Sequence, residues 1–206
     1  MLSLNLVLAV GLVAALAPRL LQLRRRYDTL ALSPIAGKPG ADAGDEALQR
    51  TLSAWVADGA GTGATLLPWT SPRVPRPLTR LQLPAERETA VRHFGYRLAG
   101  YHQLDERSRI GGILYRIGVQ LRPLAWFLPR RQDEPWDDAW LDEVDDARLS
   151  ALQRWAPRRP TLIVLHQLPA ARVEQVAAAL EIAAGRTEQP IRLLVLETGR
   201  YAHQNG

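Results

Sequence analysis

The feature that most constrains the fold is a pair of short apolar runs near the carboxyl end of the chain. TLIVL (161–165) and IRLLVL (191–196) have the length of strands, and the segment between them, 170–184, is rich in helix-forming residues. We expect that helix to stop before Gly185, because glycine is common just past a helix end. A strand, a helix and a second strand at this spacing predict two parallel strands buried on both faces. The predicted fold class is therefore α/β.

The composition is that of one modest domain with accessory segments. The chain has 206 residues, of which 47% are hydrophobic and 23% charged, as is usual for a folded protein with a core. It contains no cysteine, which excludes disulfides, thiolate nucleophiles and cysteine-bound zinc. The net charge of +5 comes from arginines that are scattered along most of the chain. Nucleic acid is therefore not expected as the main partner, because such recognition needs a clustered basic surface.

The first 26 residues predict a membrane anchor. Residues 2–23 are almost entirely apolar, and as a helix they would extend about 33 Å, close to the hydrocarbon thickness of a bilayer. Arginines follow at 24–26, so the positive-inside rule places the rest of the chain in the cytoplasm. A cleaved signal peptide is the alternative, but it would carry positive charge before the apolar run. We expect a single-pass helix in the inner membrane, with the lipid bilayer as partner through residues 2–23.

The segment after the anchor predicts mostly connecting chain. Residues 33–44 have the Pro, Gly and Ala content of a linker, and Asp45 can cap a short helix. Five prolines between 68 and 84 then exclude a central strand or an unbroken helix there. The predicted domains are 1–26, the anchor and basic stop; 27–84, the linker, short helix and Pro-rich segment; and 85–206, the α/β domain.

Four further elements are expected inside the α/β domain. The pattern predicts that 85–101 is largely helical, or a helix followed by a strand, and that 107–121 is a helix with its apolar residues on one face. A brief strand is expected over 124–129, between prolines. Residues 137–155 are expected to form an amphipathic helix, with acids favoured in its first turn. The acidic cluster between Asp133 and Asp146 is then a solvated helix face, since it lacks the spacing of a calcium loop.

The residues from Trp155 to Glu197 resemble part of a known family. WAPRRPTLIVLHQLPAARVEQVAAALEIAAGRTEQPIRLLVLE is similar to the Walker B and sensor 1 portion of bacterial signalling P-loop ATPases of the STAND and AAA type. The resemblance implies a partial P-loop-like parallel sheet with flanking helices. Together with residues 2–23, it predicts such a sheet preceded by a single transmembrane helix.

The nucleotide chemistry of that family does not transfer to this sequence. The family's magnesium-binding carboxylate corresponds to His166, and imidazole is a poor ligand for that ion. The resemblance places a phosphate loop just before residue 109, where only Arg107 and Ser108 stand in for its Lys and Ser. A loop without glycine cannot wrap its backbone N–H groups around a phosphate. Arg107, Ser108 and His166 are the candidates for a nucleotide pocket, and neither a catalytic residue nor a bound cofactor is expected.

Other motifs carry less chemistry. DGAGTGAT (58–65) has the glycines of a phosphate loop but has Ala64 in place of lysine, and no strand precedes it. The histidines are too dispersed for a helical metal motif, and no metal site is expected: His93, His102, His166 and His203.

These observations predict a membrane-anchored cytoplasmic interaction or regulatory module, which binds a protein partner and has a degenerate P-loop-like fold without catalysis. The first alternative is a nucleotide-binding ATPase subunit with a substituted site. The second is a basic surface that binds nucleic acid or anionic lipid.

Overall fold

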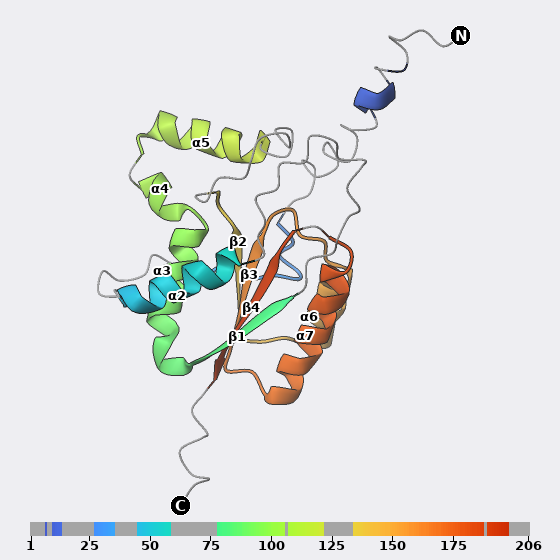
Figure 1. Ribbon diagram of the computed structural model, residues 1–206. Helices are drawn as coiled ribbons and strands as arrows, with labels where there is room; N and C mark the ends of the chain where they lie inside the picture. Colours follow the sequence, from blue (N-terminus) through green and yellow to red (C-terminus); the bar gives the residue numbers. More distant parts are fainter. Residues whose placement is uncertain are drawn as a thin grey trace, which may run out of the picture.

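A parallel β-sheet forms the centre of the molecule (Figure 1). The computed structural model describes residues 7, 10–13, 27–35, 45–58, 78–105, 107–121, 134–187 and 189–197. Within these residues the sheet has four strands in the order β1-β4-β3-β2, and every neighbouring pair is parallel. The strands are β1 (Thr79–Pro84), β2 (Asp137–Leu141), β3 (Thr161–His166) and β4 (Ile191–Glu197). The predicted α/β class is confirmed.

The carboxyl-terminal strand–helix–strand unit is confirmed as predicted. Strand β3 leads into α7 (Ala170–Ala184), which is followed by β4 in the parallel register Thr161↔Ile191 to His166↔Leu196. Both strands are buried along nearly their whole length. Burial of apolar side chains on both faces stabilises a parallel sheet, so these strands make up the middle of the core.

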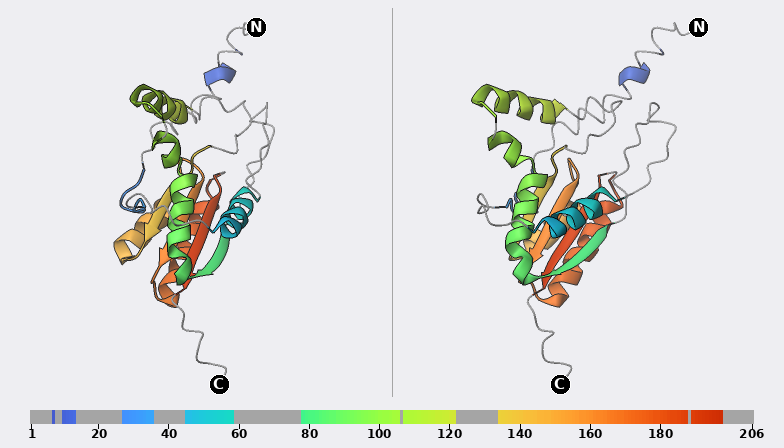
Figure 2. Two further views of the ribbon diagram at one scale, coloured as in Figure 1. Left: turned by 90° about the vertical axis from the view of Figure 1, so that its left-hand side faces the viewer. Right: turned by 60° about the vertical axis from the view of Figure 1, so that its left-hand side comes forward.

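Helices cover both faces of the sheet (Figure 2). On one face, α2 (Glu46–Ala57) and α3 (Glu88–Leu98) pack over the even-numbered residues of β3, Leu162 and Val164. On the other face, α6 (Asp146–Arg154) and α7 pack over Ile163 and Leu165. This arrangement follows from the alternation of side chains along a strand. The result is a three-layer structure with one apolar core on each side of the sheet.

Three further elements follow β1 in the described fold. A 3₁₀ turn, η1 (Ala85–Arg87), joins β1 to α3 at the carboxyl end of the strand. Helices α4 (Tyr101–Asp105) and α5 (Arg109–Leu121) follow α3. They lie at the opposite end of the sheet, since Trp136, just before β2, donates its backbone N–H to Leu98 O at 3.0 Å. The largely helical alternative for 85–101 is confirmed, and the helix predicted over 107–121 is confirmed as α5, which begins at Arg109.

The prediction of one helix over 137–155 is wrong for its first part. Residues Asp137–Leu141 form the fully buried strand β2, and the helix α6 begins only at Asp146. Two acids are tolerated inside β2 because Arg158 pairs with Asp137 and the backbone N–H of Ile35 bonds Asp138. The acids of this cluster therefore do not share one solvated helix face, since Asp137 and Asp138 lie in a buried strand.

The described α/β unit also contains residues that precede residue 85. Strand β1 is an edge strand of the sheet, and Pro84 is its last residue. Proline is tolerated in an edge strand. Residues 27–35 are part of the same unit, since Leu32 is buried and Ser33 O accepts the backbone N–H of Trp140 at 2.7 Å. The α/β unit therefore includes described parts of the segment 27–84.

The remaining predictions for this region have mixed outcomes. The short helix capped by Asp45 is confirmed as α2, where the Asp45 carboxylate accepts the Leu48 N–H at 3.0 Å. The predicted strand over 124–129, linker residues 36–44 and most of the Pro-rich segment lie outside the described residues. So does most of the predicted anchor, of which Val7 and residues 10–13 are described as helical. In the described part of the chain, no helix has the length and apolar character needed to cross a bilayer.

Candidate functional site

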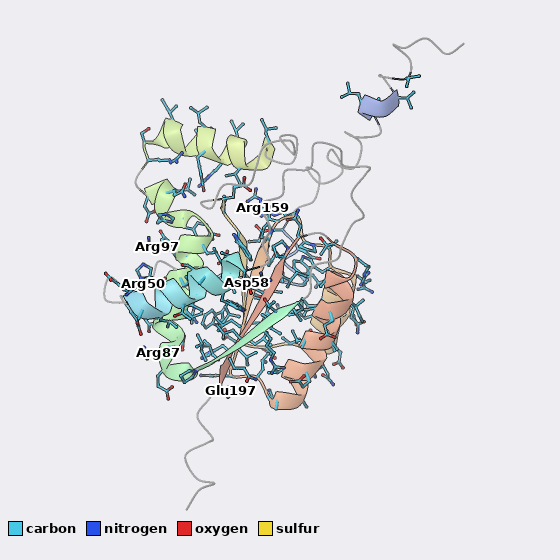
Figure 3. All side chains as sticks on the ribbon, in the orientation of Figure 1. Arg50, Asp58, Arg87, Arg97, Arg159 and Glu197 are labelled. Atoms are coloured by element: carbon cyan, nitrogen blue, oxygen red, sulfur yellow. The ribbon has the colours of Figure 1, made fainter. Side chains whose placement is uncertain are left out.

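The carboxyl edge of the sheet is the place where this fold can build a site. Ligands of open parallel sheets bind beyond the carboxyl ends of the strands, where the following connections diverge to opposite faces. Here the connection after β1 runs to the α3 face, while α6 and α7 follow β2 and β3 on the other face. Figure 3 labels Arg87 and Glu197 at this edge and Arg159 at the opposite one.

His166 lies at this edge, between two carboxylates. Its Nδ1 is 2.8 Å from Asp142 Oδ1, and its Nε2 is 3.2 Å from Glu88 Oε2. The three residues come from the ends of three strands, because Glu88 begins α3 after β1, Asp142 follows β2, and His166 ends β3. A neutral imidazole can donate to only one of these carboxylates, whereas an imidazolium donates to both.

Two further side chains close this arrangement into a ring. Arg92 Nε donates to Glu88 Oε1 at 2.9 Å, and the Arg92 guanidinium lies 3.9 Å from the centre of the Trp140 ring. The Trp140 Nε1–H donates to Asp142 Oδ1 at 2.7 Å. We call Glu88, Arg92, Trp140, Asp142 and His166 the carboxyl-edge ring. Each charged or polar group in it contacts another member of the ring, which holds His166 in place.

The turn after His166 is strained. Gln167 has φ of 56° and is the one described non-glycine residue with positive φ. A non-glycine residue in this region costs roughly 1 kcal/mol or more. The turn brings the chain from β3 into α7 within three residues, 167–169, and so keeps His166 at the end of its strand.

The segment after β1 has none of the features of a phosphate loop. In P-loop proteins a glycine-rich loop follows a strand directly and leads into a helix. The corresponding residues here are Ala85, Glu86 and Arg87, which contain no glycine and form a 3₁₀ turn. The nearby cations are paired as well, Arg87 with Asp45 and Arg92 with Glu88. This edge therefore offers a phosphate neither a backbone cradle nor an unpaired cation among these residues.

The structure does not bring the predicted pocket residues together. Arg107 and Ser108 lie between α4 and α5, at the amino edge of the sheet, whereas His166 lies at the carboxyl edge. The Arg107 guanidinium lies 4.5 Å from the centre of the Tyr115 ring, and Ser108 Oγ accepts the Gly111 N–H at 3.3 Å. Both side chains thus contact residues of α5. Of the predicted nucleotide-pocket residues, only His166 lies at the carboxyl edge.

The other sequence candidates do not join the carboxyl-edge ring. His93 lies in α3 and His102 in α4, while His203 is outside the described residues. Asp58 is the residue that follows α2, and residues 59–65 are outside the described part of the chain. In the part of the chain that is described, no three His, Asp or Glu side chains are arranged to hold a metal ion. In the carboxyl-edge ring the two carboxylates contact different nitrogens of His166 and so do not converge on one point.

A second polar cluster lies at the amino edge of the sheet. Arg158 donates to both Asp137 oxygens, at 2.8 and 2.9 Å, and this pairing raises the pKa of Arg158. Burial raises the pKa of the neighbouring Asp138 carboxyl to about 7, against the lowering effect of the Ile35 N–H. The Tyr27 hydroxyl donates to the Asp138 backbone oxygen at 2.7 Å, and burial strongly raises its pKa. This cluster holds the segment 27–35 against β2.

Sequence reasoning identified His166 but missed its partners. The sequence pattern places Asp142 on a solvated helix face, and it places Glu88 and Arg92 in the predicted helical stretch 85–101 without a role in a site. The usable signal was the rule that parallel strands end at a common edge. The rule can be applied only when β1 and β2 are recognised as strands. The local pattern does not indicate a strand in either case, because β1 ends in Pro84 and β2 begins with Asp137 and Asp138.

Comparison of the whole chain with protein-family models, curated proteins and solved structures found no match.

Proposed function

We propose that the chain is a membrane-anchored interaction module with a degenerate P-loop-like fold that has no nucleotide chemistry of its own. The observation that carries this proposal is the pairing of His166 with Glu88 and Asp142 at the carboxyl edge. In the resembled ATPases this strand end supplies a carboxylate for magnesium. Here the same place is occupied by an imidazole whose two nitrogens already contact acidic partners.

Electrostatics support the same conclusion. A bound nucleotide triphosphate needs cations and backbone donors around its phosphates. The carboxyl edge instead has Glu86, Glu88 and Asp142 close to the place where those phosphates would lie. The guanidinium of Arg92 is committed to Glu88 and the Trp140 ring. Phosphate binding would require breaking these contacts and placing an anion beside carboxylates.

The membrane part of the proposal rests on the sequence. The apolar run 2–23, followed by arginines at 24–26, has the length and charge pattern of a single-pass helix with its carboxyl side in the cytoplasm. The described fold supports an attached domain, since the segment from Tyr27 to Ile35 packs directly against the edge strand β2. With catalysis set aside, recognition of a protein partner is the function we assign to the exposed surface of this domain.

Substitution of His166 tests the proposal. His166→Asp recreates the acid of the resembled ATPases, but here it would face Glu88 and Asp142. We expect it to be less stable than His166→Asn by roughly 1–2 kcal/mol, because like charges repel and the 61% exposure of the Asp142 side chain screens only part of that repulsion. Urea unfolding of the full chain with and without Mg-ATP measures the difference.

The ATPase alternative makes the opposite predictions. It requires saturable, magnesium-dependent ATP binding by the full chain, and loss of that binding in His166→Asn. It also requires Mg-ATP to stabilise His166→Asp. We expect neither nucleotide binding nor magnesium-dependent hydrolysis in any of the three proteins, and a positive result in the unsubstituted chain would replace our proposal with this alternative.

A further inference from the structure

The helix α5 presents an apolar face to solvent. Five large apolar side chains on this helix are between 46% and 73% exposed: Ile110, Ile113, Leu114, Ile117 and Leu121. Relative to Ile110 they fall at i+3, i+4, i+7 and i+11, so they lie on one face of the helix. Elsewhere among the described residues from Tyr27 onward, the large exposed apolar side chains are isolated ones, Leu30, Tyr101 and Ile182. Contiguous exposed apolar surface of this kind marks a binding site more often than isolated side chains do.

This helix gains little stability from the domain. None of its residues belongs to either apolar core, and the helix lies beyond the end of the sheet (Figure 1). It contains three glycines, Gly111, Gly112 and Gly118, each of which costs about 1 kcal/mol relative to alanine. An isolated helix of 13 residues is marginal in water. Burial of the apolar face against a partner would supply the missing stabilisation.

The charges around the helix indicate which partner fits. From Arg107 to Gln132 the sequence contains six arginines and no aspartate or glutamate, although the chain as a whole has 21 acids for 26 basic residues. Of these arginines, Arg107 and Arg116 are described as exposed beside the apolar face. An apolar helix face flanked by arginines and free of acids is typical of helices that lie in the interface of an anionic membrane.

We propose that α5 docks on an anionic lipid surface, with the apolar face of Ile110, Ile113, Leu114, Ile117 and Leu121 in the boundary between headgroups and acyl chains. Arg107 and Arg116 would then contact lipid phosphates. The helix meets the geometric requirement, because no described helix or strand of the α/β unit covers its outer side (Figure 2). The proposal does not depend on the function proposed above, since a peripheral contact of this kind needs no anchor at residues 2–23.

A single fluorescent label on the helix tests the proposal in the full chain. Because the chain lacks cysteine, Leu114→Cys gives one site for an environment-sensitive dye. We expect blue-shifted emission and quenching by nitroxide lipids in vesicles that contain phosphatidylglycerol, and much less in pure phosphatidylcholine. Ile182→Cys is the matched control, because Ile182 is also exposed, at 52%, but lies on α7 across the sheet.

Two substitutions separate the apolar and the charged contributions. Ile113→Glu combined with Ile117→Glu should shift the docking equilibrium of the labelled helix at least about tenfold towards water, since two apolar side chains lose their burial. Arg116→Gln should weaken docking about fivefold, and added salt should reduce this effect. Ile182→Glu should change neither. All four positions are exposed and outside the cores, so folding should be preserved, and circular dichroism checks this.

Several outcomes would overturn the proposal. Equal dye shielding in neutral and anionic vesicles would exclude the charge-dependent contact. Shielding without lipid that increases with protein concentration would identify a second copy of the chain as the occupant. Concentration-independent shielding without lipid would mean that another part of the same chain covers the helix. A shift produced by nucleic acid and not by vesicles would assign the basic surface to that partner instead. In each case the dye reports on α5 itself, whether or not residues 2–23 hold the protein in the membrane.

Discussion

Adjacent residues in β2 show how the fold treats two buried acids differently. Asp137 lies beside Arg158 and receives two hydrogen bonds from its guanidinium. Asp138 points to the other face, is 3% exposed, and has one oxygen, Oδ2, without a hydrogen-bond partner. A buried carboxylate that lacks a cation favours its neutral form. Asp137 thus has a cationic partner, whereas burial favours the neutral form of Asp138.

Asp138 should make the domain less stable as the pH rises. Its pKa is raised from 3.8 to about 7, so between these values the native state holds a proton that the unfolded state has lost. The free energy of unfolding should fall through this range by at most about 1.4 kcal/mol per pH unit. Asp138→Asn removes the charge and keeps an acceptor for the Ile35 N–H. We expect this variant to be more stable than the unsubstituted chain at pH above about 7 and similar to it near pH 4.

Urea unfolding at several pH values, followed by tryptophan fluorescence, measures this difference. The matched control is Asp137→Asn, which should be destabilising because it removes the charged partner of Arg158. A pH profile for Asp138→Asn that runs parallel to that of the unsubstituted chain would show that Asp138 is already ionised in the native state.

At the scale of elements, the predictions succeeded where one physical signal dominated. The strands β3 and β4 are buried on both faces and therefore consist of unbroken apolar runs, which made them recognisable. Helix α5 keeps a regular apolar spacing although its apolar face belongs to neither described core, so its periodicity was equally clear. Strand β2 was missed because Asp137 and Asp138 depend on Arg158 and Ile35, which are distant in sequence. Tertiary contacts of this kind cannot be inferred from local pattern.

The candidate site depended on the same missing information. His166 was found because it interrupts an apolar strand at a position where the resembled family has an acid. Its partners Glu88 and Asp142 belong to segments that follow β1 and β2, and neither strand was recognised. The ring could be assembled only once the strand order β1-β4-β3-β2 placed those ends next to one another.

A buried arginine joins helix α2 to the sheet. Arg192, in β4, is 2% exposed, and its Nη2 donates to Val56 O at 3.4 Å and to Asp58 O. These carbonyls lie at the carboxyl end of α2, where backbone oxygens lack helical partners and positive charge is favourable. The contact explains how a strand tolerates an arginine on its core side, and it fixes α2 over the sheet.

Arg192→Met should therefore destabilise the domain by roughly 2–4 kcal/mol, because the carbonyls of Val56 and Asp58 lose a charged donor in a buried place. Arg80→Met is the matched control, since Arg80 lies in the neighbouring strand β1 but forms an exposed pair with Glu174. Its loss should cost less than about 1 kcal/mol. Thermal unfolding of both variants compares the two losses, and equal effects would show that the Arg192 contact does not stabilise the docked helix.

For the whole molecule, the described residues from Tyr27 onward include one α/β unit with members before residue 85. Segment 27–35 contributes Ala31 and Leu32 to one core and Ile35 to the other. It also covers the outer edge of β2, where Trp140 donates its N–H to Ser33 O. Covering an edge strand limits pairing with other chains. The segment that follows the predicted anchor is thus part of the folded domain.

Membrane extraction separates the two proposed modes of membrane contact. We expect the full chain to sediment with bacterial membranes and to resist alkaline carbonate, because residues 2–23 would span the bilayer. A chain beginning at Tyr27 should be released by carbonate, since α5 alone can provide only a peripheral contact. Immunoblotting of the two fractions measures this. Release of the full chain by carbonate would contradict the anchor and leave the α5 proposal to its own test.

The position of segment 27–35 has a mechanical consequence. Any tension applied to the chain before Tyr27 reaches the sheet through a few contacts along one strand, the Tyr27 hydroxyl on Asp138 O and the Ser33 carbonyl on Trp140 N–H among them. Trp140 also belongs to the carboxyl-edge ring, through its contacts with Asp142 and Arg92. Peeling the segment away would uncover the free edge of β2 and disturb that ring in a single step. The domain is therefore arranged so that a pull from its amino-terminal side acts first on the edge strand next to His166.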